Sequence, residues 1–260
     1  MVNDFQAELQ MLSSEARRHR IGLIVPASNT NAEPDCAMLI PSQATLHTSR
    51  SGGYDVKAIP DSNEMRRFVR QSLDQQIQLL VDARVDIIAY GCTSATLSDG
   101  PAFDREFCAQ IQRKSGCFAV TTAGALVDAI KSIGAQRVAF TSPYIKKLAD
   151  ESVGFLHKSG VEVVNQVGFE RELNSLEQGA LTPQDAYDMA LKANCDEAQA
   201  VVISCTDYRA LEALPAIEEA ISKPVITSNQ ALMYSCLKNL NLAPANLALA
   251  GQLFNPTSLS

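Results

Sequence analysis

The stretch DIIAYGCT at residues 86–93 and the stretch QAVVISCT at residues 199–206 decide the fold class of this sequence. Each is a short run of small and β-branched residues that ends in Cys-Thr, and each is followed by residues predicted to begin a helix. Continuous apolar strands separated by amphipathic helices are typical of parallel sheets that are covered on both faces. The sequence therefore predicts an α/β protein.

The same alternation of strand and helix extends along the chain in both directions. Apolar, β-branched runs predict further strands at residues 21–25, 45–49, 117–120, 137–141, 161–164 and 224–227. Helical periodicity predicts helices at residues 63–84, 101–114 and 122–133, the last of which ends at Gly134.

The two halves of the chain resemble each other. RIGLIVP at residues 20–26 matches RVAFTSP at residues 137–143, an offset of 117, and the two Cys-Thr stretches match at an offset of 113 (92 to 205). Strand–loop units can look alike without any duplication, and for the first pair this interpretation is equally good. The second pair predicts two similar parallel-sheet domains related by pseudo-two-fold symmetry, with the active site in the cleft between them. We place the first domain at residues 1–118 and the second at residues 119–228, and we expect a C-terminal helix at residues 229–260 to pack back on the first.

Composition excludes several classes of function. Hydrophobic residues make up 46% and charged residues 20%, and 22 Lys and Arg against 29 Asp and Glu give a formal net charge of −7. There is no basic run to bind nucleic acid and no apolar stretch of the roughly 20 residues that a membrane helix needs. The first twenty residues carry three acidic side chains and do not resemble a signal peptide, so we expect a cytoplasmic protein.

Seven cysteines are present, and they are expected to be free thiols because the number is odd and no secretory signal is apparent. No pair has the spacing of a zinc site, and the three histidines are scattered, so no metal is expected. Glycine-rich nucleotide loops are absent from the sequence, so no cofactor is expected either. We expect five of the cysteines to be packing residues: Cys36, Cys108, Cys117, Cys195 and Cys236.

Cys92 and Cys205 are different because each follows a predicted strand. Ligands of open parallel sheets bind beyond the carboxyl ends of the strands. A cysteine at such a strand end, at the start of a helix, lies near unpaired backbone N–H groups that favour the thiolate and can hold a carboxylate. If the halves are related by a two-fold axis, the two thiols face each other across one cleft and can act as nucleophile and proton donor.

At these residues the sequence resembles the aspartate/glutamate racemase superfamily, in which each of two similar α/β domains contributes one cysteine. Further stretches resemble its maleate cis–trans isomerase branch, and the similarity extends from about residue 20 to the C-terminus. They are PASNTNAE at 26–33, HTSR at 47–50, TSPY at 141–144, NSLEQG at 174–179, LPAIE at 214–218 and PVITSNQ at 224–230.

The resemblance implies a cofactor-independent isomerase that converts maleate to fumarate through a cysteine adduct. By matched position, Cys92 is the implied nucleophile and Cys205 the acid/base partner. The substrate, a small dicarboxylate, is expected to contact residues beside these positions, and we also expect a homo-oligomer. The expected substrate-binding residues are Asn29, Tyr144, Asn174, Thr93, Ser94 and Thr206.

Several of these residues also have a purely structural interpretation. Asn29 and Asn174 are also reasonable helix N-caps, and Thr93 and Thr206 can cap the helices predicted to follow them. His47 and Arg50 could reach a carboxylate, although a solvated arginine is more common.

Three other functions stay open on the sequence. A racemase of aspartate, glutamate or a related acid would use both thiols to exchange a proton without an adduct. The segment at residues 99–103 also resembles the arylmalonate decarboxylase branch, but that branch keeps only the second cysteine, which counts against decarboxylation. A non-catalytic carboxylate binder is the third. The chain departs from the isomerase pattern at Asn31 and Pro34, at Ser94-Ala95 and at Asp207-Tyr208, which leaves the exact substrate open.

Overall fold

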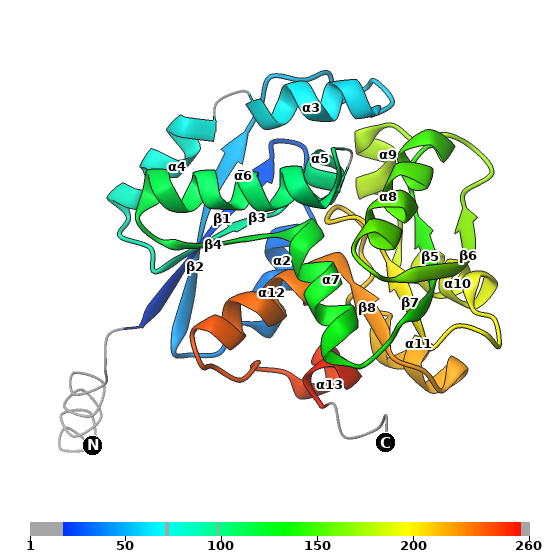
Figure 1. The fold of residues 1–260 in the computed structure, drawn as a ribbon. Coiled ribbons are helices and arrows are strands. Elements are labelled where there is room, and N and C mark those ends of the chain that lie inside the picture. Colours follow the sequence, from blue (N-terminus) through cyan, green and yellow to red (C-terminus); the bar gives the residue numbers. More distant parts are fainter. Residues whose placement is uncertain (1–17, 71–72, 98, 256–260) are drawn as a thin grey trace, which may run out of the picture.

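Two four-stranded parallel sheets form the framework of the protein in a computed structural model that describes residues 18–70, 73–97 and 99–255 (Figure 1). The first sheet has the order β2-β1-β3-β4 and the second the order β6-β5-β7-β8. All strand pairs are parallel. The predicted α/β class with parallel sheets is confirmed.

The first half holds the first sheet and its helices. Its strands are β1 (His19–Pro26), β2 (Ala44–Ser51), β3 (Ile87–Tyr90) and β4 (Phe118–Thr121). Its helices are α2 (Ala32–Leu39), α3 (Ser62–Arg70), α4 (Leu73–Asp82), α5 (Thr93–Leu97) and α6 (Gly100–Ser115).

The second half repeats this plan. Its strands are β5 (Arg137–Ser142), β6 (Glu162–Gly168), β7 (Ala200–Ile203) and β8 (Val225–Thr227). Its helices are α7 (Thr122–Ser132), α8 (Lys146–Lys158), α9 (Ser175–Gly179), α10 (Pro183–Ala193), α11 (Leu214–Ile221), α12 (Ser228–Asn239) and α13 (Leu247–Ala250), followed by a 3-10 turn at Gln252–Phe254.

The two sheets have the same topology, because β5, β6, β7 and β8 take the positions that β1, β2, β3 and β4 take in the first sheet. In each sheet the chain order reverses between the two central strands. Such a switch point opens a crevice at the carboxyl ends of those strands. The loops after β1 and β3, and after β5 and β7, are therefore where the fold can place a ligand.

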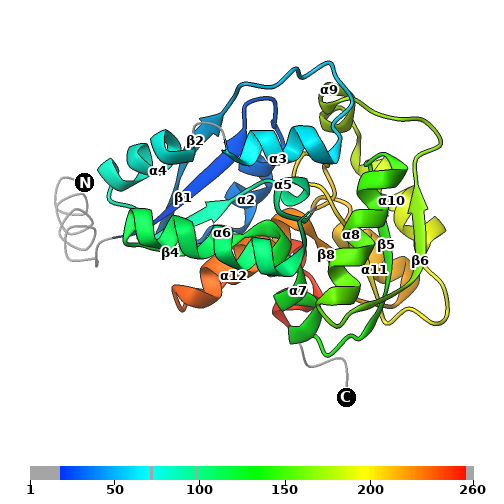
Figure 2. The ribbon, with the colours of Figure 1, turned by 45° about the horizontal axis from the view of Figure 1, so that its top comes forward.

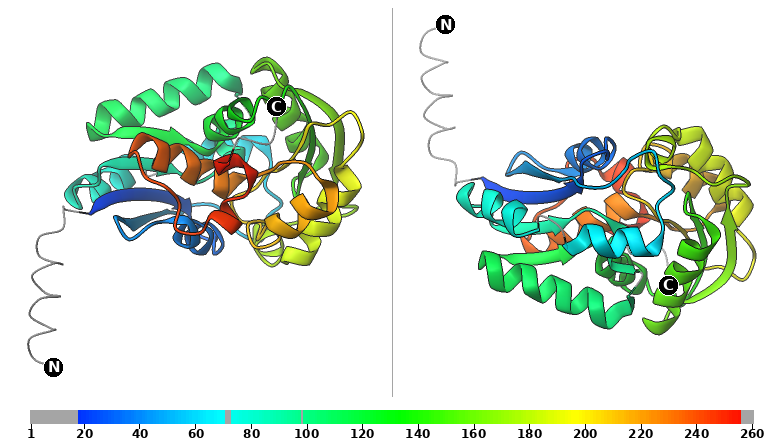
Figure 3. Two further views of the ribbon diagram at one scale, coloured as in Figure 1. Left: turned by 90° about the horizontal axis from the view of Figure 1, so that it is seen from below. Right: turned by 90° about the horizontal axis from the view of Figure 1, so that it is seen from above.

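The halves share one hydrophobic core. The largest cluster of buried side chains includes Leu23 of β1 and Phe140 of β5. Helix α7 lies between the two sheets (Figure 1), and α12 packs against α7, against α2 and against β3 and β4 of the first sheet (Figure 3). The core thus fixes one sheet against the other, which any site between them requires. The predicted boundaries at residues 118 and 228 stay predictions.

Two local expectations are wrong. The helix expected at residues 63–84 is divided into α3 and α4, because its apolar residues serve two surroundings: α3 packs on α5, whereas α4 packs on β2 and α6. The helix expected directly after Cys205 is absent, and turns lead instead to α11, which starts at Leu214 with a proline in its first turn. Instead of starting a helix, the polar groups that follow Cys205 bond to the first half of the chain: the Thr206 hydroxyl donates to the Gly91 carbonyl oxygen, and the Asp207 carboxylate accepts from the Thr30 N–H.

Within the described part of the chain, no helix combines the length and apolar character needed to cross a membrane. The expectation about a signal peptide falls on residues 1–17, and the end of the expected C-terminal helix falls on residues 256–260; both segments lie outside the described residues.

Candidate active site

Four loops at the two switch points meet at one cavity between the sheets. Asn29 follows β1, Cys92 follows β3, Tyr144 follows β5 and Cys205 follows β7, and all four line this cavity. Helices α3 and α9 lie on the same side of the junction between the halves (Figures 1 and 2). The structure thus brings both predicted cysteines to one site, with one contributed by each half.

The close approach of β3 to β1 places Cys92. A Cβ atom on the preceding residue, Gly91, would lie 3.1 Å from side-chain atoms of Leu23 and Val25 and 3.2 Å from the carbonyl oxygen of Ile24. The Gly91 N–H donates to that carbonyl at 2.7 Å, so the backbone leaves the sheet in a fixed direction. A glycine is needed where the backbone approaches this closely.

The Cys92 thiol is buried, and burial raises its pKa to about 11. Two groups of the first turn of α5 oppose that rise: the backbone N–H of Ala95 and the hydroxyl of Ser94, whose Oγ lies 3.8 Å from Cys92 Sγ. Asp207 acts in the opposite sense, because its negative charge disfavours the thiolate. Desolvation is the largest effect, so Cys92 is mainly a thiol at neutral pH.

Burial raises the pKa of Cys205 further than that of Cys92, and the charge of Asp207 adds to the rise. The Asp207 N–H donates to Cys205 Sγ at 3.4 Å, and Sγ lies 3.9 Å from Oε1 of Gln178, to which it can donate. The Cys205 N–H donates to the hydroxyl of Ser228 at 3.1 Å. Of the two thiols, Cys92 is therefore the easier to ionise and Cys205 the better proton holder.

Asn29 connects the halves at the cavity. Its Nδ2 donates to Oγ1 of Thr206 at 3.1 Å, and the Thr206 hydroxyl donates to the carbonyl oxygen of Gly91 at 3.1 Å. Its Oδ1 accepts from the N–H groups of Asn31 at 3.1 Å and Ala32 at 2.9 Å, so Asn29 also caps the start of α2. One side chain thus lines the cavity and also binds the backbone at the start of α2, whose N-cap position is Asn31.

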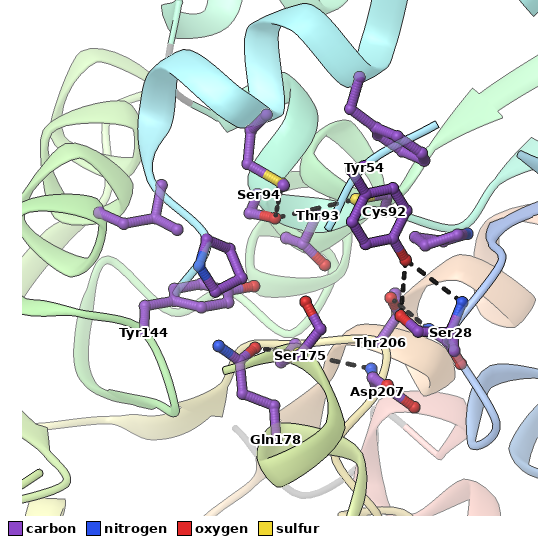
Figure 4. A pocket seen from close by; sticks show the side chains of 17 residues that line it. Ser28, Tyr54, Cys92, Thr93, Ser94, Tyr144, Ser175, Gln178, Thr206 and Asp207 are labelled. Atoms are coloured by element: carbon purple, nitrogen blue, oxygen red, sulfur yellow. Dashed lines mark hydrogen bonds between the residues drawn. The ribbon is translucent and has the colours of Figure 1, made fainter. Parts of the chain in front are cut away.

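Tyr144 and Thr93 contribute hydroxyls to the same space. Burial raises the pKa of Tyr144 well above its ordinary value, and both thiols lie close enough for their charges to affect it. Its Oη is 3.4 Å from the Ser204 hydroxyl, and Thr93 Oγ1 is 3.0 Å from the Ser228 hydroxyl. The hydroxyls of Tyr144, Thr93 and Ser175 point toward one another across the cavity (Figure 4). Tyr144 is therefore a neutral hydrogen-bond donor at working pH.

The structure gives Asn174 a different position from the one expected. Asn174 caps α9: its Oδ1 accepts from the Glu177 N–H at 3.0 Å, and the Glu177 carboxylate accepts from the Asn174 N–H at 2.9 Å. Asn174 does not line the cavity, whereas Ser175 and Gln178 of the same turn do. The pattern N-x-x-E at residues 174–177 predicts this capping box. Ser175 and Gln178 are three residues apart and therefore share a face of the helix. Both features could have been recognised in the sequence.

Sequence reasoning missed other lining residues, most of them on segments without a chemical motif. Tyr54, Pro60, Met65 and Phe68 come from the chain between β2 and the end of α3. The Tyr54 hydroxyl lies 2.6 Å from the Ser28 hydroxyl and accepts from the Ser28 N–H at 3.2 Å (Figure 4). The lining residues also include Pro26, Leu148 and Asp207.

His47 and Arg50 do not line the cavity. Thr45 Oγ1 lies 2.9 Å from His47 Nε2 on β2. Arg50 donates to the carbonyl oxygen of Asn29 at 2.7 Å and forms an ion pair with Glu33. Arg50 therefore supports the Asn29 loop from outside.

The cavity carries no cationic side chain among its described lining residues. Its donors are hydroxyls, amides and backbone N–H groups, which can stabilise a carboxylate or a developing enediolate when they are fixed in place. Across the described ranges of the chain, no group of three or more His, Cys, Asp or Glu is arranged to hold a metal ion. The chemistry that this arrangement offers is thiol addition and proton transfer on a small acid.

Comparison with known proteins points to one group of enzymes. A family model described as arylmalonate decarboxylase matches residues 21–254. A maleate isomerase of Geobacillus stearothermophilus is 30% identical over 241 residues, which cover 87% of this chain and 94% of that protein. A cysteine-to-alanine variant of the maleate isomerase Iso from Pseudomonas putida S16, crystallised with maleate, matches with a TM-score of 0.84 at 27% identity and covers 94% of this chain and 100% of its own. A cysteine-to-serine variant of the Nocardia farcinica maleate cis–trans isomerase holds a covalently bound succinylcysteine intermediate; it matches with a TM-score of 0.83 at 25% identity and covers 92% of this chain and 99% of its own.

Proposed function

We propose that this chain, which belongs to the arylmalonate decarboxylase family and is similar to maleate isomerases, is a cofactor-independent maleate isomerase. It converts maleate to fumarate through a covalent cysteine adduct. The observation that carries the proposal is the meeting of Cys92 and Cys205, one from each half of the chain, at a single cavity.

The unequal surroundings of the two thiols support the assignment of their roles. Cys92 has the lower pKa of the two, because burial raises the pKa of Cys205 further and the charge of Asp207 acts more strongly on Cys205. Cys205 is held more firmly in the protonated form by burial and by the charge of Asp207. We therefore assign attack on the alkene to the Cys92 thiolate and proton transfer to the Cys205 thiol.

The reaction starts from the minor fraction of the protein in which Cys92 has lost its proton to solvent, and from there it balances without an added reagent. The Cys92 thiolate forms a C–S bond to one alkene carbon, and the adjacent carbon takes the proton of the Cys205 thiol, which leaves a succinyl adduct and a Cys205 thiolate. The central carbon–carbon bond is now single and can rotate. Cys205 removes a proton from the rotated adduct, the C–S bond breaks, and fumarate leaves. The succinylcysteine seen in the N. farcinica variant, in which one cysteine is serine, is the corresponding species in that protein.

Neutral donors are assigned to the substrate carboxylates. Asn29, Tyr144, Thr93, Ser94 and Thr206 surround the two thiols, and all five line the cavity. Ser175 and Gln178 take the place that the resemblance suggested for Asn174. Fixed donors of this kind act where charge develops during addition and elimination.

A cytoplasmic location and a homo-oligomeric state stay predictions. Nothing in the structure tests either of them. Gel filtration coupled to light scattering would measure the second directly.

The test of the function is proton NMR of purified protein with maleate and no added cofactor. The proposal expects the maleate singlet to be replaced by the fumarate singlet. Unchanged maleate, together with deuterium uptake at the α-carbon of aspartate or glutamate, would contradict it and favour a racemase.

A further inference from the structure

The carboxylate of Asp207, whose charge raises the pKa of Cys205 in addition to burial, also makes several hydrogen bonds between the halves. Its Oδ1 accepts from the Thr30 N–H at 2.9 Å, the Asn31 N–H at 3.3 Å and the Asn31 Nδ2 at 3.1 Å. The same Asn31 amide also donates to the Asp207 carbonyl oxygen at 3.0 Å. One side chain of the second half thus holds two consecutive residues of the loop after β1.

The end of α9 is part of the same cluster. Asn31 Nδ2 donates to the carbonyl oxygen of Gly179 at 2.9 Å. A Cβ atom on Gly179 would lie 2.8 Å from Asp207 Oδ2, a distance that real Cβ atoms do not reach. The absence of a side chain at residue 179 is therefore what lets the carboxylate lie there.

Each of the three segments joined by this cluster also supplies a lining residue of the cavity. The loop after β1 supplies Asn29, the loop after β7 supplies Cys205, and α9 supplies Gln178. We propose that Asp207 is a positioning residue for the reaction: its carboxylate fastens the Asn29 loop of the first half to the Cys205 loop and to α9 of the second.

The direction of the Asp207 side chain favours positioning over direct catalysis. The side chain points away from the hydroxyls of Ser175 and Thr93 (Figure 4). Its Oδ1 accepts from residues 30 and 31, and its Oδ2 lies against residue 179.

The inference rests on the proposed function for its kinetic test, so the experiment has one kinetic and one structural arm. The variant is Asp207→Ala, and the matched control is Glu218→Ala. Glu218 is 9% exposed against 8% for Asp207, and its carboxylate likewise accepts from two backbone N–H groups, those of Val225 at 3.0 Å and Gln252 at 3.1 Å. Glu218 does not line the cavity.

In the kinetic arm, both variants are expected to lower Tm, but only Asp207→Ala should lower kcat/KM for maleate well below that Tm. A loss of about tenfold to a hundredfold is expected, because a misplacement of the order of 1 Å can cost that much. Asp207→Asn keeps an acceptor oxygen for the loop and should restore most of the loss.

A double-mutant cycle identifies the route of the effect. If Asp207 acts by placing Asn29, then Asp207→Ala should cost much less in an Asn29→Ala background than in the wild type. Additive losses, or equal losses in Asp207→Ala and Glu218→Ala, would overturn the proposal. If Asp207→Ala does not fold, Asn31→Ala removes the amide of the same cluster and is tested in its place, with the same expected results.

The structural arm does not need turnover. Hydrogen exchange followed by mass spectrometry should show faster exchange in the peptide that contains residues 30 and 31 for Asp207→Ala, and wild-type exchange there for Glu218→Ala. Unchanged exchange in this peptide for Asp207→Ala would overturn the proposal even if the enzyme is active. If the wild type does not turn over maleate but Asp207→Ala shows the expected faster exchange, the proposed function is contradicted and the positioning role is supported.

Discussion

At the scale of single residues, the site consists of two buried thiols whose surroundings differ. The N–H of Ala95 and the hydroxyl of Ser94 favour ionisation of Cys92, whereas the charge of Asp207 adds to the effect of burial on Cys205. The sequence placed both cysteines correctly, because a strand end in a parallel sheet is a local feature. It gave no measure of this difference, which depends on burial and on groups distant in the chain.

The pKa of Cys92, raised to about 11, predicts how its reactivity depends on pH. Below that value the thiolate fraction, and with it the rate of alkylation by iodoacetamide, should rise about tenfold for each pH unit. Peptide mapping after timed alkylation from neutral pH to about pH 10 measures this rate for Cys92 alone. A plateau that begins near neutral pH would show that the thiol is already ionised there, contrary to its burial.

Asn29→Ala should reduce kcat/KM for maleate by about tenfold to a hundredfold, since hydrogen bonds to charged groups contribute about 1.5–3 kcal/mol. The matched control is Asn246→Ala, which removes an asparagine that caps α13 through the Leu249 N–H and does not line the cavity. Steady-state kinetics of the two variants separate a site residue from a cap. Wild-type kinetics in Asn29→Ala would mean that Asn29 serves only α2.

At the scale of elements, strand and helix positions were predictable because apolar periodicity is written locally. The parts that were not predictable depend on what each element packs against. The apolar residues of the expected helix at 63–84 serve two surroundings, so it is divided, and Asn174 caps α9 while Ser175 and Gln178 line the cavity. The sequence pointed to Asn174 as a residue of the cavity, whereas the position of each residue on α9 places Ser175 and Gln178 there.

Asn174→Ala should therefore lower the free energy of unfolding by about 1 kcal/mol, the usual effect of losing an N-cap. Asn174→Ser keeps a capping oxygen and should retain both stability and kcat/KM. Urea unfolding and steady-state kinetics on both variants make the comparison. A large loss of kcat/KM in Asn174→Ser, with stability retained, would restore the direct substrate contact that the resemblance suggested.

At the scale of the whole molecule, two of the buried carboxylates, those of Asp35 and Asp207, join the two halves. Asp35 of α2 accepts from Nδ2 of Asn229 at 2.8 Å, and that amide also donates to the Thr206 carbonyl oxygen at 3.0 Å. Asp207 joins the loop after β7 to the loop after β1 through the Thr30 N–H. No sequence pattern predicts the contacts that Asp35 and Asp207 make with the other half, because their partners lie 176 or more residues away in the chain. The arrangement of the halves is for this reason the part of the structure least accessible to sequence analysis.

Burial raises the pKa of Asp35 from 3.8 to about 7, although the hydrogen bond from Asn229 opposes the rise. Between these values the folded state binds more protons than the unfolded chain, so stability should fall as pH increases through this window. Asp207, with its pKa raised to about 6, acts in the same direction. Tm should accordingly be higher near pH 5 than near pH 8, by an amount on the order of several degrees.

Asp35→Asn should reduce this pH dependence. An amide at residue 35 cannot ionise, and it offers a donor to Oδ1 of Asn229, which is buried without a hydrogen-bond partner among the described residues. Thermal unfolding of the wild type and the variant across the pH range tests this. An identical pH dependence in both proteins would exclude Asp35 as its source.

The most direct measurement of the central claim is intact-protein mass spectrometry of Cys92→Ser and Cys205→Ser after incubation with maleate, followed by peptide mapping. Serine at residue 205 leaves the attacking thiol in place, so this variant should gain the mass of one maleate on Cys92, while its turnover falls by about 10²–10⁴-fold. Serine at residue 92 is a much weaker nucleophile, so that variant should gain no mass. The same added mass on Cys205 of the Cys92→Ser protein would reverse the two roles, and the absence of an adduct in both variants would contradict covalent isomerisation.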